Sequence, residues 1–149
     1  MITVLLADDH TLIRDALCYL LEAQGDIKII ATASDGQEAV EQAMQLCPDV
    51  AVLDISMPRM DGIEAARRIC SLCSQTRIVM LTIYHTSEHV QHAMRAGASG
   101  FVLKDAAGQE LVAAVRTLYA GGRFFSSKIS AIDKNYGKQR GKGAQNNSA

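Results

Sequence analysis

Apolar residues recur along this chain in two patterns that alternate and differ in period. Five short runs are almost continuously apolar, which is typical of strands buried on both faces of a sheet. These runs span residues 2–7, 27–33, 50–53, 77–82 and 100–103. After each run, apolar residues return every three or four positions, which predicts an amphipathic helix. The helical patterns span residues 12–21 and then residues near 36–47, 62–73, 86–96 and 108–120.

This alternation of strand and helix predicts an α/β fold. Each strand–helix–strand unit is right-handed, so the strands form a parallel sheet with helices on both faces. Five strands with polar residues after the first favour the flavodoxin-like, doubly wound class, with strand order 2-1-3-4-5 and five helices. Other orders remain open from the residues alone.

Acidic residues stand at the carboxyl ends of two predicted strands. Asp8 and Asp9 follow the first apolar run, and Asp54 follows the third. In the order 2-1-3-4-5 these strands are neighbours, so the three carboxylates would converge in the crevice where open α/β sheets bind ligands. Carboxylates held together repel one another, and a cation relieves that repulsion. Because all the ligand atoms are oxygens, we expect the ion to be Mg²⁺.

The residues at this edge suit phosphoryl transfer. Asp54 is the expected nucleophile, because a carboxylate can hold a phosphoryl group as an aspartyl phosphate. We expect Asp9, Asp54 and the backbone carbonyl of Ser56 to bind Mg²⁺, with Asp8 acting directly or through water. Thr82 and Lys104 end the fourth and fifth strands, where a hydroxyl and an ammonium group can contact a phosphoryl group.

The composition limits the class of protein but does not identify its chemistry. The 149 residues are 48% hydrophobic and 21% charged, as expected for a globular protein with one domain. No signal peptide or membrane-spanning run is recognisable, so a cytoplasmic location is predicted. The cysteines, Cys18, Cys47, Cys70 and Cys73, are interpreted as small apolar residues in a reducing compartment. Cys70 and Cys73 have CxxC spacing but no second such pair to complete a zinc site.

Four segments together resemble the receiver domain of two-component response regulators. They read LLADDH at 5–10, DISMPRMDG at 54–62, LT at 81–82 and AGASGFVLK at 96–104. The resemblance covers about residues 2–121. It implies that Asp54 takes a phosphoryl group from a sensor histidine kinase in the presence of Mg²⁺. It assigns the Mg²⁺ acid pair to Asp8 and Asp9, phosphate contacts to Thr82 and Lys104, and an aromatic switch to Phe101.

The residues after Lys104 refine this resemblance. Many receivers have proline after the lysine, whereas here Asp105 and Ala106 follow, as in receivers that precede a LuxR-type helix-turn-helix. The resemblance therefore implies transcriptional control through a DNA-binding domain absent from this chain. Phosphorylation would alter the surface of the fourth helix, fifth strand and fifth helix, through which we expect phosphorylation-dependent homodimerisation.

The chain is thus predicted to have three parts. Residues 1–121 form the receiver domain, 122–133 a docking or linker segment, and 134–149 a flexible basic tail or linker with four cations and no acid. Within the segment 122–133, Phe124 and Phe125 form an apolar patch expected to dock on the body.

Two enzyme classes remain as alternatives. His85, Glu88 and His89 match the HxxEH pattern of one class of zinc hydrolase, although His85 is expected in a loop. The second alternative is a phosphohydrolase with an aspartyl-phosphate intermediate. Such enzymes often have a second acid two positions after the nucleophile, where this chain has Ser56. We therefore expect a non-enzymatic phosphoacceptor with slow self-phosphorylation from small donors and slow self-dephosphorylation, its rate tuned by Ser56 and Tyr84.

Overall fold

The computed structural model describes residues 1–83 and 86–127, and it contains a parallel sheet with a helix after almost every strand. The strands are β1 Ile2–Ala7, β2 Ile27–Ala33, β3 Val50–Asp54, β4 Arg77–Thr82, β5 Gly100–Leu103 and β6 Phe124–Phe125. The helices are α1 Thr11–Glu22, α2 Gly36–Leu46, α3 Gly62–Leu72, α4 Ser87–Arg95 and α5 Ala107–Tyr119, with a 3₁₀ turn η1 at Lys104–Ala106. None of these helices has the length and hydropathy needed to cross a bilayer.

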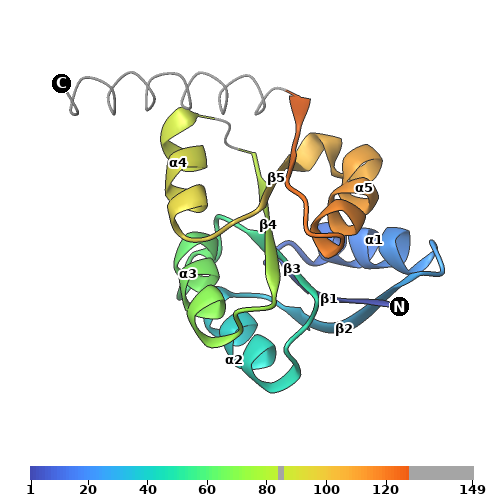
Figure 1. Ribbon diagram of the computed structural model, residues 1–149, viewed down its shortest axis with the longest axis horizontal. Helices are drawn as coiled ribbons and strands as arrows, with labels where there is room; N and C mark the ends of the chain where they lie inside the picture. Colours follow the sequence, from blue (N-terminus) through green and yellow to red (C-terminus); the bar gives the residue numbers. More distant parts are fainter. Residues whose placement is uncertain (84–85, 128–149) are drawn as a thin grey trace.

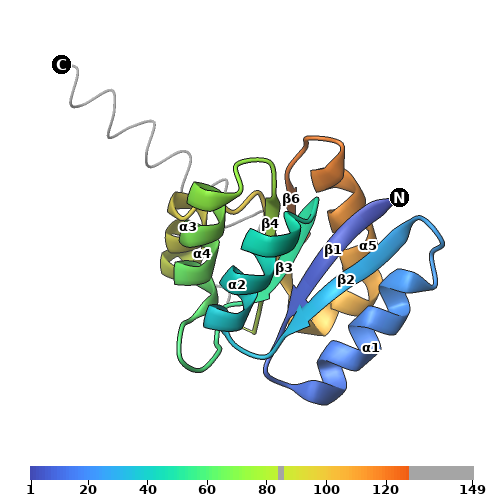
Figure 2. The same ribbon diagram turned by 90° about the horizontal axis from the view of Figure 1, so that it is seen from below.

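The sheet has the order β2-β1-β3-β4-β5-β6, so the predicted 2-1-3-4-5 core is confirmed. All strand pairs are parallel. Helices α1 and α5 cover one face of the sheet, and α2, α3 and α4 cover the other (Figures 1 and 2). The flavodoxin-like doubly wound fold follows from this arrangement.

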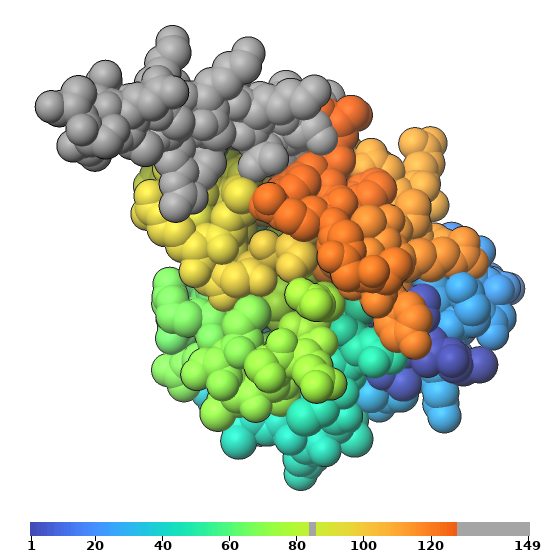
Figure 3. Space-filling model, viewed as in Figure 1, coloured from blue at the N-terminus to red at the C-terminus, as the bar shows by residue number. Residues whose placement is uncertain are grey.

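The structure adds one short strand to the five that the sequence predicts. Phe124 and Phe125 form β6, which pairs with Gly100 and Phe101 of β5. Two residues are too few to show the alternation that predicts a strand. The edge strand β5 nevertheless offers unpaired backbone groups, and pairing satisfies them. In Figure 3 the chain after α5 (deep orange) lies against α5 (lighter orange).

Each face of the sheet has its own hydrophobic core. The face under α1 and α5 buries β-strand residues such as Leu6 and Val52 against Leu21 and Leu111. The opposite face buries residues such as Leu53 and Phe101 against α2, α3 and α4. This double burial is the reason that the strands read as continuous apolar runs in the sequence.

Helix α2 begins where a side chain caps it. Asp35 accepts a hydrogen bond from the Glu38 backbone N–H at 2.8 Å and also binds the Arg59 guanidinium, with Nη2 2.6 Å from Oδ2. This capping bond, followed by the hydrogen bond from Arg59, holds the pKa of Asp35 below its usual range. The ion pair joins the loop after β2 to the loop after β3.

Helix α3 begins directly against the end of β3. A Cβ added to Gly62 would lie 2.0 Å from the Asp54 carbonyl oxygen, and the Gly62 N–H donates to the Ile55 carbonyl at 2.8 Å. Only glycine allows the helix to approach the strand this closely. The start of α3 is therefore fixed relative to Asp54.

Candidate functional site

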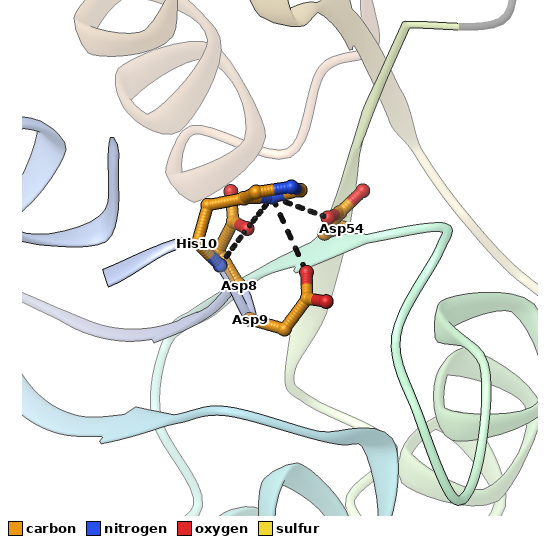
Figure 4. Close-up of side chains that lie close together, drawn as sticks. All are labelled: Asp8, Asp9, His10 and Asp54. Carbon is orange, nitrogen blue, oxygen red and sulfur yellow. Dashed lines mark hydrogen bonds and ion pairs between the residues drawn. The ribbon is translucent and has the colours of Figure 1, made fainter. Parts of the chain in front are cut away.

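The carboxyl edge of the sheet brings together the predicted polar residues. Asp8 directly follows β1, Asp54 is the last residue of β3, Thr82 is the last residue of β4, and Lys104 directly follows β5. Because these strands are adjacent and parallel, their ends share one edge of the sheet. Figure 4 shows Asp8, Asp9 and Asp54 converging from two of these loops.

Lys104 is the cation at the centre of the site. Its Nζ lies 2.9 Å from Asp54 Oδ2 and 3.1 Å from Asp8 Oδ2. The Lys104 side chain is only 9% exposed, and those of Asp8 and Asp54 are 0% and 3% exposed. One buried ammonium group therefore partly compensates two buried carboxylates, which leaves the cluster with a net negative charge.

Asp54 is the carboxylate whose ionisation is most disfavoured. Burial raises the pKa of Asp54 to about 6, and the charge of Asp8 adds to the rise against the opposing hydrogen bond from Lys104. The Ser56 backbone N–H donates to Asp54 Oδ1 at 3.2 Å. Asp54 is thus ionised at neutral pH, yet more basic than an ordinary carboxylate.

The pKa values of Asp8 and Lys104 shift in the directions expected for a stabilised ion pair. Burial alone would raise the pKa of Asp8, but the His10 backbone N–H and the Lys104 ammonium group together hold it below the usual value. Burial would likewise lower the pKa of Lys104, but Asp54 and Asp8 raise it instead. The pKa values of the neighbouring carboxylates Asp8 and Asp54 are therefore shifted in opposite directions, which is typical of functional sites.

The donor set fits a hard divalent cation. Asp8, Asp9, His10 and Asp54 each offer one ligand atom, and these atoms lie within 4.8 Å of one another. Asp8 Oδ2 is buried without a well-aligned hydrogen bond, although Lys104 Nζ lies 3.1 Å away. A carboxylate oxygen left in this state is available to a metal ion. Carboxylate oxygens suit Mg²⁺, the ion predicted from the sequence.

His10 is a site residue that the sequence reasoning missed. Its Nδ1 lies 3.0 Å from Asp8 Oδ1, 3.3 Å from Asp9 Oδ1 and 3.2 Å from Lys104 Nζ. The ring lies over the carboxylates (Figure 4), although 58% of the side chain is exposed. Its position directly after two acids was the available signal. The backbone turn that brings the ring back over them was not readable from that position.

The two predicted switch residues are both buried. Thr82 is 1% exposed and Phe101 is 0% exposed. Phe101 pairs in register with Met80 on one side and Phe125 on the other. Phe101 therefore lies within the hydrophobic core of the face covered by α2, α3 and α4.

Two predicted residues, Tyr84 and His85, lie outside the described residues. Of the HxxEH pattern, His89 is described, and its Nδ1 lies 2.5 Å from the Thr86 hydroxyl. Within residues 1–83 and 86–127, the one group of side chains placed to hold a metal ion is the cluster at the acidic edge. Nothing in the described part of the chain supports a zinc hydrolase.

Comparison with known proteins agrees with this geometry. A family model described as the response regulator receiver domain matches residues 4–116. The uncharacterized transcriptional regulatory protein YxjL of Bacillus subtilis (strain 168) is 42% identical over 130 residues, which cover 87% of this chain and 60% of YxjL. The oxygen regulatory protein NreC of Staphylococcus carnosus (strain TM300) is 38% identical over 128 residues, which cover 85% of this chain and 59% of NreC. The chain spans about 60% of the length of these curated relatives.

Solved structures show the same fold. A LuxR-family two-component response regulator from Aurantimonas sp. SI85-9A1 matches with a TM-score of 0.86 and 33% identity, covering 91% of this chain and 98% of that one. The signal receiver domain of NarL from Mycobacterium tuberculosis matches with a TM-score of 0.77 and 35% identity, covering 80% and 97% of the two chains. The chain therefore belongs to the response regulator receiver family, as a receiver domain of the LuxR and NarL type.

Proposed function

We propose that Asp54 is the phosphoacceptor of this receiver and that a sensor histidine kinase supplies the phosphoryl group. The observation that carries the proposal is a buried carboxylate with a pKa raised to about 6, held 2.9 Å from a buried lysine ammonium group. A more basic carboxylate is a better nucleophile, and it remains ionised at neutral pH.

The chain's own residues act on the phosphoryl group as follows. An oxygen of Asp54 attacks phosphorus while the bond from phosphorus to the donor atom breaks, and the bonding pair leaves with the donor. Asp54 Oδ1 accepts a hydrogen bond from the Ser56 backbone N–H, and Asp54 Oδ2 accepts one from Lys104 Nζ. The carboxylate is therefore oriented before the reaction. Lys104 then pairs with the phosphoryl oxygens as a point charge.

The acidic residues would hold the metal cofactor. Asp8, Asp9, Asp54 and the backbone carbonyl of Ser56 are the proposed ligands for Mg²⁺. When bound, Mg²⁺ would neutralise charge on the equatorial oxygens of the transferring group. Thr82, at the end of β4, would donate a hydrogen bond from its hydroxyl group to a phosphoryl oxygen.

The proposed output is a change in the surface formed by α4, β5 and α5. Thr82 is drawn toward the phosphate and Phe101 is retained in its buried position, which biases an existing equilibrium between two conformations. That surface would mediate phosphorylation-dependent homodimerisation and control transcription through a DNA-binding domain outside this chain. Slow self-dephosphorylation follows from the lack of a second acid at Ser56, and the side chains of Ser56 and Tyr84 are proposed to tune its rate.

The proposed function predicts a mass change at one residue. Incubation with acetyl phosphate and Mg²⁺ should add a single phosphoryl group of about 80 Da, because the carboxylate accepts it without a partner enzyme. Intact-mass spectrometry measures the adduct. Asp54→Asn should show none, since an amide is not a nucleophile toward phosphorus.

Asp105→Asn is the matched control, since Asp105 is an exposed acid next to Lys104 and is not among the residues placed to hold a metal ion. This variant should be phosphorylated like the parent. A phosphoryl adduct of undiminished yield on Asp54→Asn would refute the proposal.

Mg²⁺ should raise thermal stability because it binds only the assembled acid cluster. At about ten times its dissociation constant, the ion should stabilise the fold by about 1.4 kcal/mol. Asp9→Asn should reduce this gain, since it removes one proposed ligand. Thermal unfolding with and without Mg²⁺ measures the difference.

Asp15→Asn, an exposed position on α1, serves as the control and should keep the full gain. If Asp9→Asn responds to Mg²⁺ as strongly as the parent does, Asp9 is not a ligand.

A further inference from the structure

Two of the cysteines meet at the end of the sheet opposite Asp54. Cys47 caps the carboxyl end of α2, and Cys73 caps the carboxyl end of α3. The following residues lead into the amino ends of β3 and β4, so both caps lie far from the phosphoacceptor edge. All four cysteines are free thiols.

The geometry brings the two sulfur atoms close together. Cys47 Sγ lies 3.4 Å from Cys73 Sγ, and Cys73 Sγ donates to the Ala43 carbonyl at 3.2 Å. A disulfide requires about 2.05 Å between sulfur atoms, so the two sulfur atoms must approach each other by about 1.4 Å. Cys47 is exposed at a helix end and can make this movement, whereas Cys73 is 6% exposed and packed in the core.

Cys70 is not part of this pair despite its CxxC spacing with Cys73. Its sulfur donates to the Gly97 carbonyl at 3.7 Å, in the turn between α4 and β5. Cys70 and Cys73 have the CxxC spacing, but the sequence alone did not pair them. Packing instead selects Cys47, which is 26 residues away along the chain.

We propose that Cys47 and Cys73 are an oxidisable pair that forms a reversible disulfide when the protein meets a hydroperoxide. An open cavity of about 250 Å³, lined in part by Cys47, Cys73 and Thr76, gives a small oxidant access to the sulfur atoms. The disulfide joins the carboxyl ends of α2 and α3, two helices on the same face of the sheet (Figure 2).

The chemistry proceeds in two balanced steps. The Cys47 thiol attacks the peroxide, the O–O bond breaks, and the products are a Cys47 sulfenic acid and one molecule of alcohol or water. Cys73 sulfur then attacks the Cys47 sulfur and displaces hydroxide, which takes up the thiol proton and leaves as water. Two thiols are thereby oxidised, and the peroxide gains two electrons. A dithiol reverses the reaction by exchange.

Cys73 is suited to the second step rather than the first. Burial, followed by the hydrogen bond with Cys47, raises the pKa of Cys73 to about 11. A buried thiol that holds its proton reacts slowly with free peroxide. Once Cys47 is oxidised, however, the adjacent sulfur atom provides a high effective concentration for the intramolecular step.

The test is oxidation of the full chain with excess hydrogen peroxide, followed by alkylation of the remaining thiols. Intact mass should show two of the four thiols protected and a loss of about 2 Da. Non-reducing peptide mapping should link Cys47 to Cys73. The oxidised protein should unfold at a temperature raised by about 5 °C or more, and dithiothreitol should abolish the shift.

Cysteine variants distinguish a Cys47–Cys73 disulfide from a disulfide that involves Cys70. Cys70→Ser should still form the disulfide, whereas Cys47→Ser, an exposed substitution, should leave Cys73 alkylatable after denaturation. A Cys70–Cys73 link would overturn the proposal. So would oxidation of Cys47 to the sulfinic acid with Cys73 still a free thiol.

Discussion

Asp54→Asn should make the protein more stable, although it removes the proposed phosphoacceptor. Burial of Asp54 raises its pKa from 3.8 to about 6, a shift that corresponds to about 3 kcal/mol of disfavoured ionisation. That figure already includes the opposing interaction with Lys104, and an uncharged amide avoids the cost but leaves Lys104 paired with Asp8 alone. We therefore expect a net gain of about 2 kcal/mol in the free energy of unfolding at about pH 7.5 without Mg²⁺.

The gain in the free energy of unfolding that Asp54→Asn produces should increase as the pH rises. Between pH 3.8 and about 6 the folded protein holds a proton on Asp54 that the unfolded chain has released, so the parent loses stability as pH rises through this window. The variant has no such proton. The difference between the two proteins should thus be near zero at about pH 4 and reach its full size above about pH 7.

Asp8→Asn provides a comparison of opposite sign. The pKa of Asp8 is lowered, so its ionised form stabilises the fold above the unfolded pKa and that stability disappears as pH falls through the folded pKa. Asp8→Asn should therefore not stabilise the protein at neutral pH. Urea unfolding of both variants at several pH values measures the effect. Equal stability of Asp54→Asn and the parent above pH 7 would contradict the burial argument.

The sequence predicted which polar residues meet at the carboxyl edge of the sheet, because strand order decides which strand ends are neighbours there. Continuous apolar runs identified the buried parallel strands, and polar residues directly after the runs ending at Ala7, Leu53 and Leu103 had to share one edge. Asp8, Asp54 and Lys104 meet as this reasoning required. Their pKa values could not be foreseen, because these depend on burial and on distances between side chains.

The features missed by the sequence depend on short or non-local contacts. Strand β6 has two residues, fewer than any periodic pattern can reveal. The His10 ring reaches the acids through the backbone turn before α1, and Cys73 meets Cys47 through the packing of α2 against α3. The contacts of His10 with Asp8 and Asp9 are between sequence neighbours but depend on the backbone turn, whereas Cys47 and Cys73 are 26 residues apart along the chain.

Gly62→Ala should destabilise the protein and impair phosphoryl acceptance together. The new Cβ would lie 2.0 Å from the Asp54 carbonyl oxygen, a backbone atom that cannot rotate away. Either α3 or the end of β3 must move, at a cost of about 3 kcal/mol or more. A shift of about 1 Å in the nucleophile can lower the rate up to about 100-fold. Urea unfolding and the rate of the acetyl phosphate reaction measure the two effects.

Gly108→Ala is the matched control, because a Cβ there meets no atom within 4 Å and the position lies in α5. Alanine in a helix is favoured over glycine by up to about 1 kcal/mol, so this variant should be as stable as the parent or slightly more stable, with an unchanged reaction rate. The contrast between the two alanine variants separates steric contact with Asp54 from the general effect of replacing glycine. If Gly62→Ala were as stable and as reactive as Gly108→Ala, the start of α3 would not fix the position of Asp54.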